Sequence, residues 1–174
     1  MEWRRPNDDE SAGYFNRYIE QVPGEDAIAV LKQSYATTRD LMISLSLSQW
    51  DHRYDVGKWS IKEVWVHILD TERIFAYRAL RFGRGDETPL PGFDQDDYIV
   101  PSNAANRTIA SIIAEYEAVR KSTLSLFENF TEAALNRSGL AANNKVSVRA
   151  FAFIIAGHEI HHIKGLRDNY RVKI

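Results

Sequence analysis

The chain has 174 residues, of which 26% are charged, and its 22 basic side chains nearly balance its 24 acidic ones. This balance provides no excess positive charge for nucleic acid or for an anionic membrane surface, so we expect small molecules as its partners. The absence of cysteine excludes disulfides, thiolate ligands and a cysteine nucleophile. The length favours a single domain over residues 1–174, with a core that needs no covalent staples.

No targeting or membrane segment is predicted. Residues 1–15 lack an apolar stretch of signal-peptide length. No part of the chain approaches the roughly 18 to 20 apolar residues that a membrane span requires. We therefore expect a cytoplasmic protein that acts away from the membrane.

The first predicted element is a short helix over residues 9–20, which we expect to pack over the main body with an apolar face formed by Tyr14, Phe15, Tyr18 and Ile19. Pro23 and Gly24 then break the chain. The first long helix is predicted from Glu25 to about Leu47, because its apolar residues recur near helical spacing.

A second long helix is predicted from Ser60 to about Phe82, after an aromatic-rich connection over residues 48–59. Ser60 and Glu63 have the S-x-x-E spacing of a capping box, which marks the start of this helix. Residues 83–103 contain three prolines and three glycines, so they predict a long loop. Loops of this length are commonly functional or disordered.

The third and fourth long helices occupy the rest of the chain. The third is predicted from about Asn106 to Phe130, followed by a polar connection with one helical turn near residues 131–135. Ser147 is the predicted N-cap of the last helix. Four long helices and no convincing strand favour an all-α fold: an antiparallel four-helix bundle with a short extra N-terminal helix and an undetermined order of connections.

Two histidines of the last helix form a candidate metal-binding pair. His158 and His162 continue the apolar stripe of Phe151, Ile155 and Leu166, so they point into the bundle. Side chains four residues apart on a helix can converge on one ion. Spacing alone also allows His161 to replace either neighbour, while His52 lies in a polar connection and is expected at the surface.

A catalytic metal would need a third ligand from another helix, and His67 is the candidate. It lies at the edge of the apolar stripe of the second helix, where an inward tilt would bring it to the interior. Taken alone, a histidine in this position is more often a hydrogen-bonded core residue. Together with the pair, it predicts a three-histidine site.

The segment GHEIHHIKGLRD, residues 157–168, also has the H-E-x-x-H pattern of zinc proteases. In that interpretation Glu159 would be the general base and Asp168 the third ligand. The metzincin pattern needs a methionine turn after the third ligand, yet Met1 and Met42 lie far upstream. With no sheet edge to bind an extended peptide, we reject the protease interpretation.

Several segments together resemble the DinB superfamily. They are KWSIKEVWVHILDTE (residues 58–72), GHEIHHI (157–163) and LPGFDQDDY (90–98), while residues 4–26 resemble the YfiT-like branch of that family. The resemblance implies a four-helix bundle that holds a divalent ion, zinc or nickel, through His67, His158 and His162. It also implies a homodimer.

Two kinds of reaction follow from the resemblance. Some family members use a low-molecular-weight thiol, bacillithiol or mycothiol, for S-transfer or isomerisation, and YfiT-like members are described as metal-dependent hydrolases. A metal-bound water with a pKa lowered toward about 7 would serve hydrolysis, and a cosubstrate thiolate would serve S-transfer. The missing cysteine agrees with both. A metal-binding or sensing domain without turnover is the alternative.

Four further residues are candidates for an outer shell around the ligands. Asp70 and Glu63 lie three and four residues from His67, within helical reach of its ring. His161 and Glu159 lie between the two histidines of the last helix. Simpler roles compete with this one, because Glu63 also belongs to the capping box and Asp70 can face water.

Overall fold

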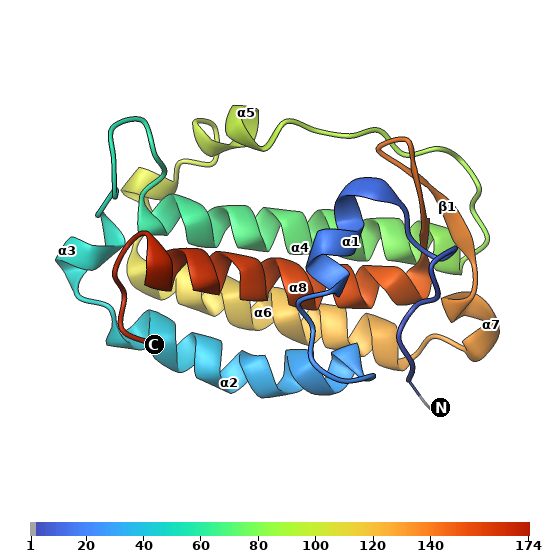
Figure 1. Cartoon of the computed structure of the whole chain (residues 1–174). Coiled ribbons are helices and arrows are strands. Elements are labelled where there is room, and N and C mark those ends of the chain that lie inside the picture. Colours follow the sequence, from blue (N-terminus) through green and yellow to red (C-terminus); the bar gives the residue numbers. More distant parts are fainter. Residues whose placement is uncertain (1–2) are drawn as a thin grey trace.

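The structure is a computed structural model that describes residues 3–174. Four long helices form its body: α2 (Ala27–Ser44), α4 (Ile61–Gly83), α6 (Ile109–Glu128) and α8 (Val148–Asp168). The main contacts place α2 against α6 and α8, and α4 against the same two helices, so α2 and α4 lie diagonally opposite (Figure 1). This arrangement confirms the predicted all-α four-helix bundle and supplies the order that the sequence left open.

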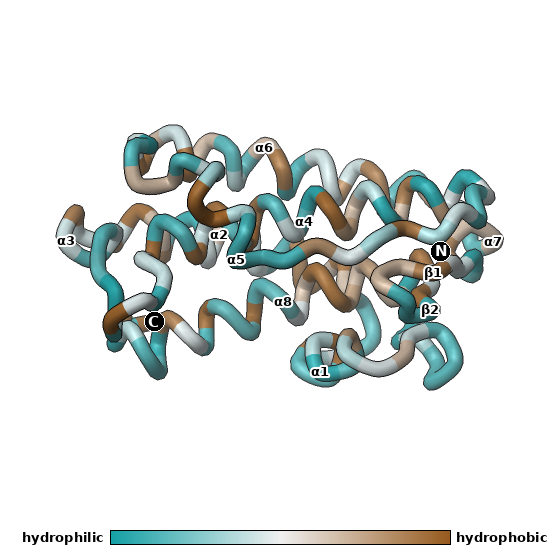
Figure 2. Tube along the Cα trace, turned by 90° about the horizontal axis from the view of Figure 1, so that it is seen from above, coloured by the Kyte–Doolittle hydropathy of each residue, from teal (hydrophilic) through white to brown (hydrophobic). Residues whose placement is uncertain are grey.

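The helix starts follow the predicted caps. Ser60 and Glu63 form the capping box of α4, in which each accepts a hydrogen bond from the backbone N–H of the other, at 2.6 Å and 3.3 Å. The Ser147 hydroxyl accepts from the Ala150 N–H at 2.9 Å at the start of α8. Figure 2 shows apolar and polar residues alternating along the long helices, as expected for helices that bury one side.

The long connection after α4 is a crossover. Figure 1 shows that α4 and α6 run in the same direction, so the chain must return along the bundle before α6 begins. A helix of 23 residues is about 35 Å long, which explains the length of this connection. The sequence predicted a loop over this whole connection, but the connection contains α5 (Gln95–Ile99) and the 3-10 turn η2 (Ala104–Asn106).

The sequence prediction missed two other short elements. Helix α3 (Leu47–Trp50) lies in the predicted connection and has its own capping box, formed by Ser46 and Gln49. The chain also forms a β-hairpin of β1 (Ser138–Ala141) and β2 (Asn144–Ser147), so the expectation of no strand was wrong. Both central turn residues, Ala142 and Asn143, have positive φ, a geometry usually signalled by Asn-Gly rather than Ala-Asn.

The N-terminal segment covers α8. It forms the 3-10 turn η1 (Gly13–Phe15) and α1 (Asn16–Ile19), a shorter helical segment than residues 9–20. Phe15, Tyr18 and Ile19 are buried as predicted, whereas Tyr14 is exposed. A Cβ at position 157 would lie 1.9 Å from the carbonyl oxygen of Tyr18, so only glycine permits this close approach of α1 to α8.

The remaining short helix, α7 (Glu132–Leu135), confirms the turn predicted near residues 131–135. The hairpin that follows ties distant segments together, because Leu90 pairs with Ala141 and Ser11 pairs with Val146. No helix among residues 3–174 combines the length and apolar character needed to cross a bilayer.

Candidate metal centre

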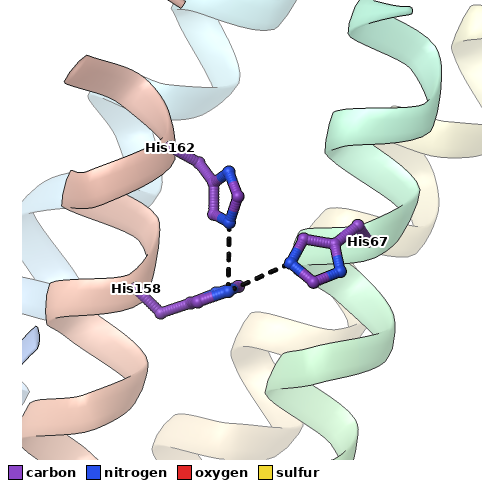
Figure 3. A group of neighbouring side chains, drawn as sticks. All are labelled: His67, His158 and His162. Carbon is purple, nitrogen blue, oxygen red and sulfur yellow. Dashed lines mark hydrogen bonds between the residues drawn. The ribbon is translucent and has the colours of Figure 1, made fainter. Parts of the chain in front are cut away.

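The structure brings His67, His158 and His162 together between α4 and α8 (Figure 3). The Nε2 atom of His158 lies 3.1 Å from Nε2 of His67 and 3.1 Å from Nε2 of His162. One nitrogen from each ring lies within 4.8 Å of the others. Among residues 3–174, no further histidine or acidic side chain joins this group.

The packing around the rings fixes their positions. His67 and His158 are each only 4% exposed, and His162 is partly buried. The Trp59 ring packs on His67 with centroids 4.9 Å apart, and Tyr18 packs edge-on against His158 at 5.3 Å. Helix α1 and the connection before α4 therefore restrict solvent access to the ligand candidates.

Burial keeps the three imidazoles neutral. It lowers the pKa of His67 to about 4, and a smaller effect comes from the nearby His161. Burial also lowers the pKa of His158 and His162 well below the usual range, and the neighbouring histidines lower both further. Neutral rings present a lone pair at neutral pH, which is the state that a metal ion requires.

The arrangement fits a first-row metal ion. Three nitrogens placed about 2.0 to 2.1 Å from a tetrahedral ion lie about 3.3 Å from each other, close to the two 3.1 Å separations here. Imidazole is a favoured ligand of zinc and nickel. The Thr71 hydroxyl lies 3.4 Å from Nδ1 of His67, which is the ring nitrogen that faces away from the cluster. The residues present therefore suit a three-histidine site with an open position.

Two of the four outer-shell candidates, Glu63 and Asp70, interact with other residues. Glu63 accepts from Ser60 and from Arg53, whose Nη2 lies 2.9 Å away. Asp70 is partly exposed on α4 and lies 3.8 Å from Arg73. Among the described residues, neither of these carboxylates forms a hydrogen bond with His67.

The other two candidates lie beside the pair in the chain but not at its nitrogens. His161 is exposed and lies outside the group of three, but its ring packs edge-on against His162 at 5.2 Å and against Tyr18 at 5.6 Å. Glu159 points away from His158 toward α2 and α6. Thr71 and Trp59 take the neighbouring positions instead, and only Thr71 had a sequence signal, its four-residue spacing from His67.

Glu159 belongs to a second buried polar cluster, which the sequence analysis did not predict. Arg120 of α6 donates two hydrogen bonds to Glu72 of α4, at 3.0 Å and 2.9 Å. It donates another to Glu159 at 2.5 Å. Glu159 also accepts from Tyr116 at 3.1 Å and from Thr38 at 3.2 Å. Burial would raise the pKa of Glu159, but the charge and hydrogen bonds of Arg120 lower it, so the carboxylate stays ionised.

Asp168, the third ligand of the rejected protease interpretation, is exposed at the end of α8 and pairs with Arg167 at 2.7 Å. It does not belong to the histidine group. The interaction with Arg120 likewise holds Glu159 away from the general-base position of a zinc protease. The structure thus agrees with rejecting that function.

Two cavities flank the histidines. The first, of about 390 Å³, lies among α1, α4, α8 and residues 92–95 and reaches His67 and His158. The second, of about 620 Å³, lies beside residues 54–59 and the end of α8 and reaches His162. Gln95 borders both, so the crossover connection passes over the site. We name them the His67 cavity and the His162 cavity.

The DinB superfamily sequence profile matches residues 31–164, and the chain therefore belongs to this superfamily. A relative from Oceanobacillus iheyensis, which carries the name "putative metal-dependent hydrolase", is 29% identical over 153 residues. The aligned region covers 85% of this chain and 87% of the relative. This family membership confirms the resemblance found in the sequence.

Two solved structures share the fold. YfiT from Bacillus subtilis, described as a probable metal-dependent hydrolase with an unusual four-helix bundle topology, matches with a TM-score of 0.74 at 17% identity. That match covers 98% of this chain and 94% of YfiT. A mycothiol-dependent maleylpyruvate isomerase matches with a TM-score of 0.67 at 12% identity, over 83% of this chain and 61% of the isomerase. The bundle is thus of the YfiT type.

Proposed function

We propose that this protein is a metal-dependent enzyme acting on small molecules, in which His67, His158 and His162 hold one divalent ion, zinc or nickel. The observation that carries the proposal is the convergence of three neutral imidazoles, two buried and one partly buried, between two cavities. A closed structural site would need a fourth protein ligand, and none among residues 3–174 joins the group. An open position favours an enzyme over a purely structural or sensing role.

The donor set determines what the bound ion can supply. Because the three ligands are neutral, they would leave the double charge of a bound ion uncompensated, and the ion would supply strong Lewis acidity toward a water or a thiol. The surrounding residues hold this arrangement in place. Thr71 supports the His67 ring, and Trp59 and Tyr18 shield the rings from bulk water.

Two reactions remain candidates, each supported by a different observation. Hydrolysis is supported by the names of the Oceanobacillus relative and of YfiT. Thiol-dependent S-transfer is supported by the presence of two cavities, since a substrate in one and a thiol cosubstrate such as bacillithiol in the other would both reach the histidines. The fold of the mycothiol-dependent isomerase agrees with this second reaction.

Metal analysis tests the site itself. Protein purified without a metal-affinity tag is analysed for metal in the wild type, in His158→Ala and in His161→Ala as a matched control from the same helix. We expect about one ion per chain in the wild type and control, and almost none in His158→Ala. A wild type without stoichiometric metal, whose melting temperature does not respond to zinc or nickel, would refute the proposal.

A substrate screen separates the two reactions. Simple esters and amides are offered without thiol, and electrophilic substrates are offered with and without bacillithiol. Only S-transfer should depend on added thiol. Homodimerisation and a cytoplasmic location also stay predictions from the sequence, and light scattering coupled to size exclusion tests the dimer.

A further inference from the structure

The far end of the His67 cavity contains a buried cation without a counter-ion. Arg78 of α4 is only 4% exposed and lines this cavity together with His67 and His158. Its Nη2 donates to the Pro91 carbonyl at 2.7 Å. No acidic side chain among residues 3–174 forms an ion pair with it, although other buried arginines such as Arg120 have carboxylate partners.

The unused donors of Arg78 face the cavity. Nε and Nη1 form no hydrogen bond with any described residue, and neither is among the fully enclosed polar atoms that lack a partner. They therefore reach the open space that the side chain lines. A guanidinium fork of this kind pairs with a carboxylate through two parallel hydrogen bonds.

The energetic environment favours an anion at this position. Burial lowers the pKa of Arg78, and Tyr98 is the group whose charge partly opposes this effect. Placing a buried positive charge without a counter-ion costs free energy, and an anionic ligand would recover part of it. The aromatic rings of Phe75 and Phe93, whose centroids lie 5.9 Å and 6.0 Å from the guanidinium carbon, surround the charge with apolar surface.

The arrangement along α4 gives the expected shape of the ligand. His67, Thr71, Phe75 and Arg78 all line the same cavity, at helical steps of four, four and three residues. Positions 67 and 78 are about 16 Å apart along the helix axis, and the long arginine side chain shortens the distance to be spanned. Between the two ends the walls include the aromatic rings of Phe15, Tyr18 and Phe75. Asp94 also borders this cavity, but it forms no ion pair with Arg78.

We propose that Arg78 is the anion-binding residue of this cavity, so the ligand is a small organic carboxylate with an apolar body, bound with its carboxylate at Arg78. This assignment rests on the proposed function, and it places the reacting end of the ligand at the three histidines. The same carboxylate chemistry could belong to the substrate or to a carboxylate-bearing thiol cosubstrate.

The test uses metal-free protein, because a bound ion would itself attract carboxylates. The affinity of 3-phenylpropanoate is compared with that of its neutral analogue 3-phenylpropanamide by NMR titration. We expect the wild type to prefer the carboxylate by about 10-fold to 100-fold, the range for a hydrogen bond to a charged group. Arg78→Met should lose this preference. Arg73→Met, which removes the same charge from the same helix outside the cavity, should keep it.

Two results would overturn the assignment: equal affinity of the wild type for acid and amide, or an unchanged preference in Arg78→Met. If Arg78→Met does not fold, Arg78→Lys replaces it, since lysine keeps the charge but lacks the fork. A reduced preference in Arg78→Lys supports the assignment, and an unchanged one contradicts it. The metal content of each variant is measured before the ion is removed. A lost carboxylate preference at Arg78 is thereby distinguished from a loss of metal binding at the three histidines.

A second pair of probes identifies the source of the carboxylate. Bacillithiol is compared with the methyl ester of its carboxyl groups, again in the wild type and Arg78→Met. Where 3-phenylpropanoate binding depends on Arg78, bacillithiol binding that also depends on Arg78 supports the assignment with a thiol cosubstrate. Bacillithiol binding that is independent of Arg78 supports it with a substrate carboxylate.

Discussion

Helix α8 carries two buried polar clusters that differ in how completely their groups are paired. Glu159 lies in a closed network in which the Arg120 guanidinium pairs with both Glu159 and Glu72. His158, the preceding residue, lies in a cluster of three ring nitrogens that no acidic side chain of residues 3–174 joins, and two cavities lie next to it. The difference teaches that burial alone does not distinguish the two clusters, whereas the completeness of their pairing does.

The largest effect is expected from breaking the closed network. Arg120→Met leaves Glu72 and Glu159 buried without a positive charge, so we expect the free energy of unfolding to fall by about 3 to 5 kcal/mol. Urea denaturation of the metal-free protein measures this loss. Arg39→Met, which removes an exposed pair with Glu117, should cost less than about 1 kcal/mol. A loss as small as that of the control would mean that the network contributes little to stability.

The open cluster should respond to metal instead. Zinc at 100 times its dissociation constant should stabilise the wild type by about 2.7 kcal/mol, because it binds only the folded chain. His158→Ala should show no such gain in stability with zinc. The pairing of Arg120 is left intact in that variant. Melting temperature with and without zinc measures the effect, and a chelator should reverse it. Equal stabilisation of wild type and His158→Ala would contradict the assigned ligands.

A smaller change should affect metal affinity without affecting the fold. Thr71→Val keeps the side-chain shape but removes the hydroxyl next to Nδ1 of His67. We expect zinc affinity to fall by about tenfold, the lower range for partners of ligand histidines. Competition with a chromophoric chelator measures the affinity. If the affinity is unchanged, Thr71 does not orient the ring.

The smallest effect separates Glu63 from the metal site. Burial would raise the pKa of Glu63, but hydrogen bonds from Arg53 and Ser60 more than offset this and lower it. Its contribution is therefore complete above the unfolded-state pKa and is lost as the pH falls through the lower folded-state pKa. Glu63→Gln should cost about 1 kcal/mol at neutral pH, and the difference from wild type should shrink in acid.

Denaturant unfolding at several pH values measures this contribution, and zinc affinity serves as the control. An unchanged affinity agrees with a capping role for Glu63. A large loss of zinc affinity would mean that Glu63 supports the ligand histidines.

Much of the fold and the histidine cluster could be predicted from the sequence. The Ser60 and Glu63 capping box fixed the register of α4, and helical spacing put His158 and His162 on one face. The β-hairpin could not be predicted, because four-residue strands carry almost no periodic signal and its turn lacks glycine. Thr71 had the right spacing from His67, but its hydroxyl contact depends on how the ring is turned.

The sequence by itself determined the properties that depend on local periodicity: the four long helices, the caps of α4 and α8, and the inward direction of His158 and His162. Only the tertiary structure decided which buried groups meet. Glu159 and His158 are adjacent in the chain, yet helical geometry turns them about 100° apart, toward different neighbouring helices. Arg120 and His67 reach them from α6 and α4, 39 and 91 residues away, and contacts of that separation depend on helix packing.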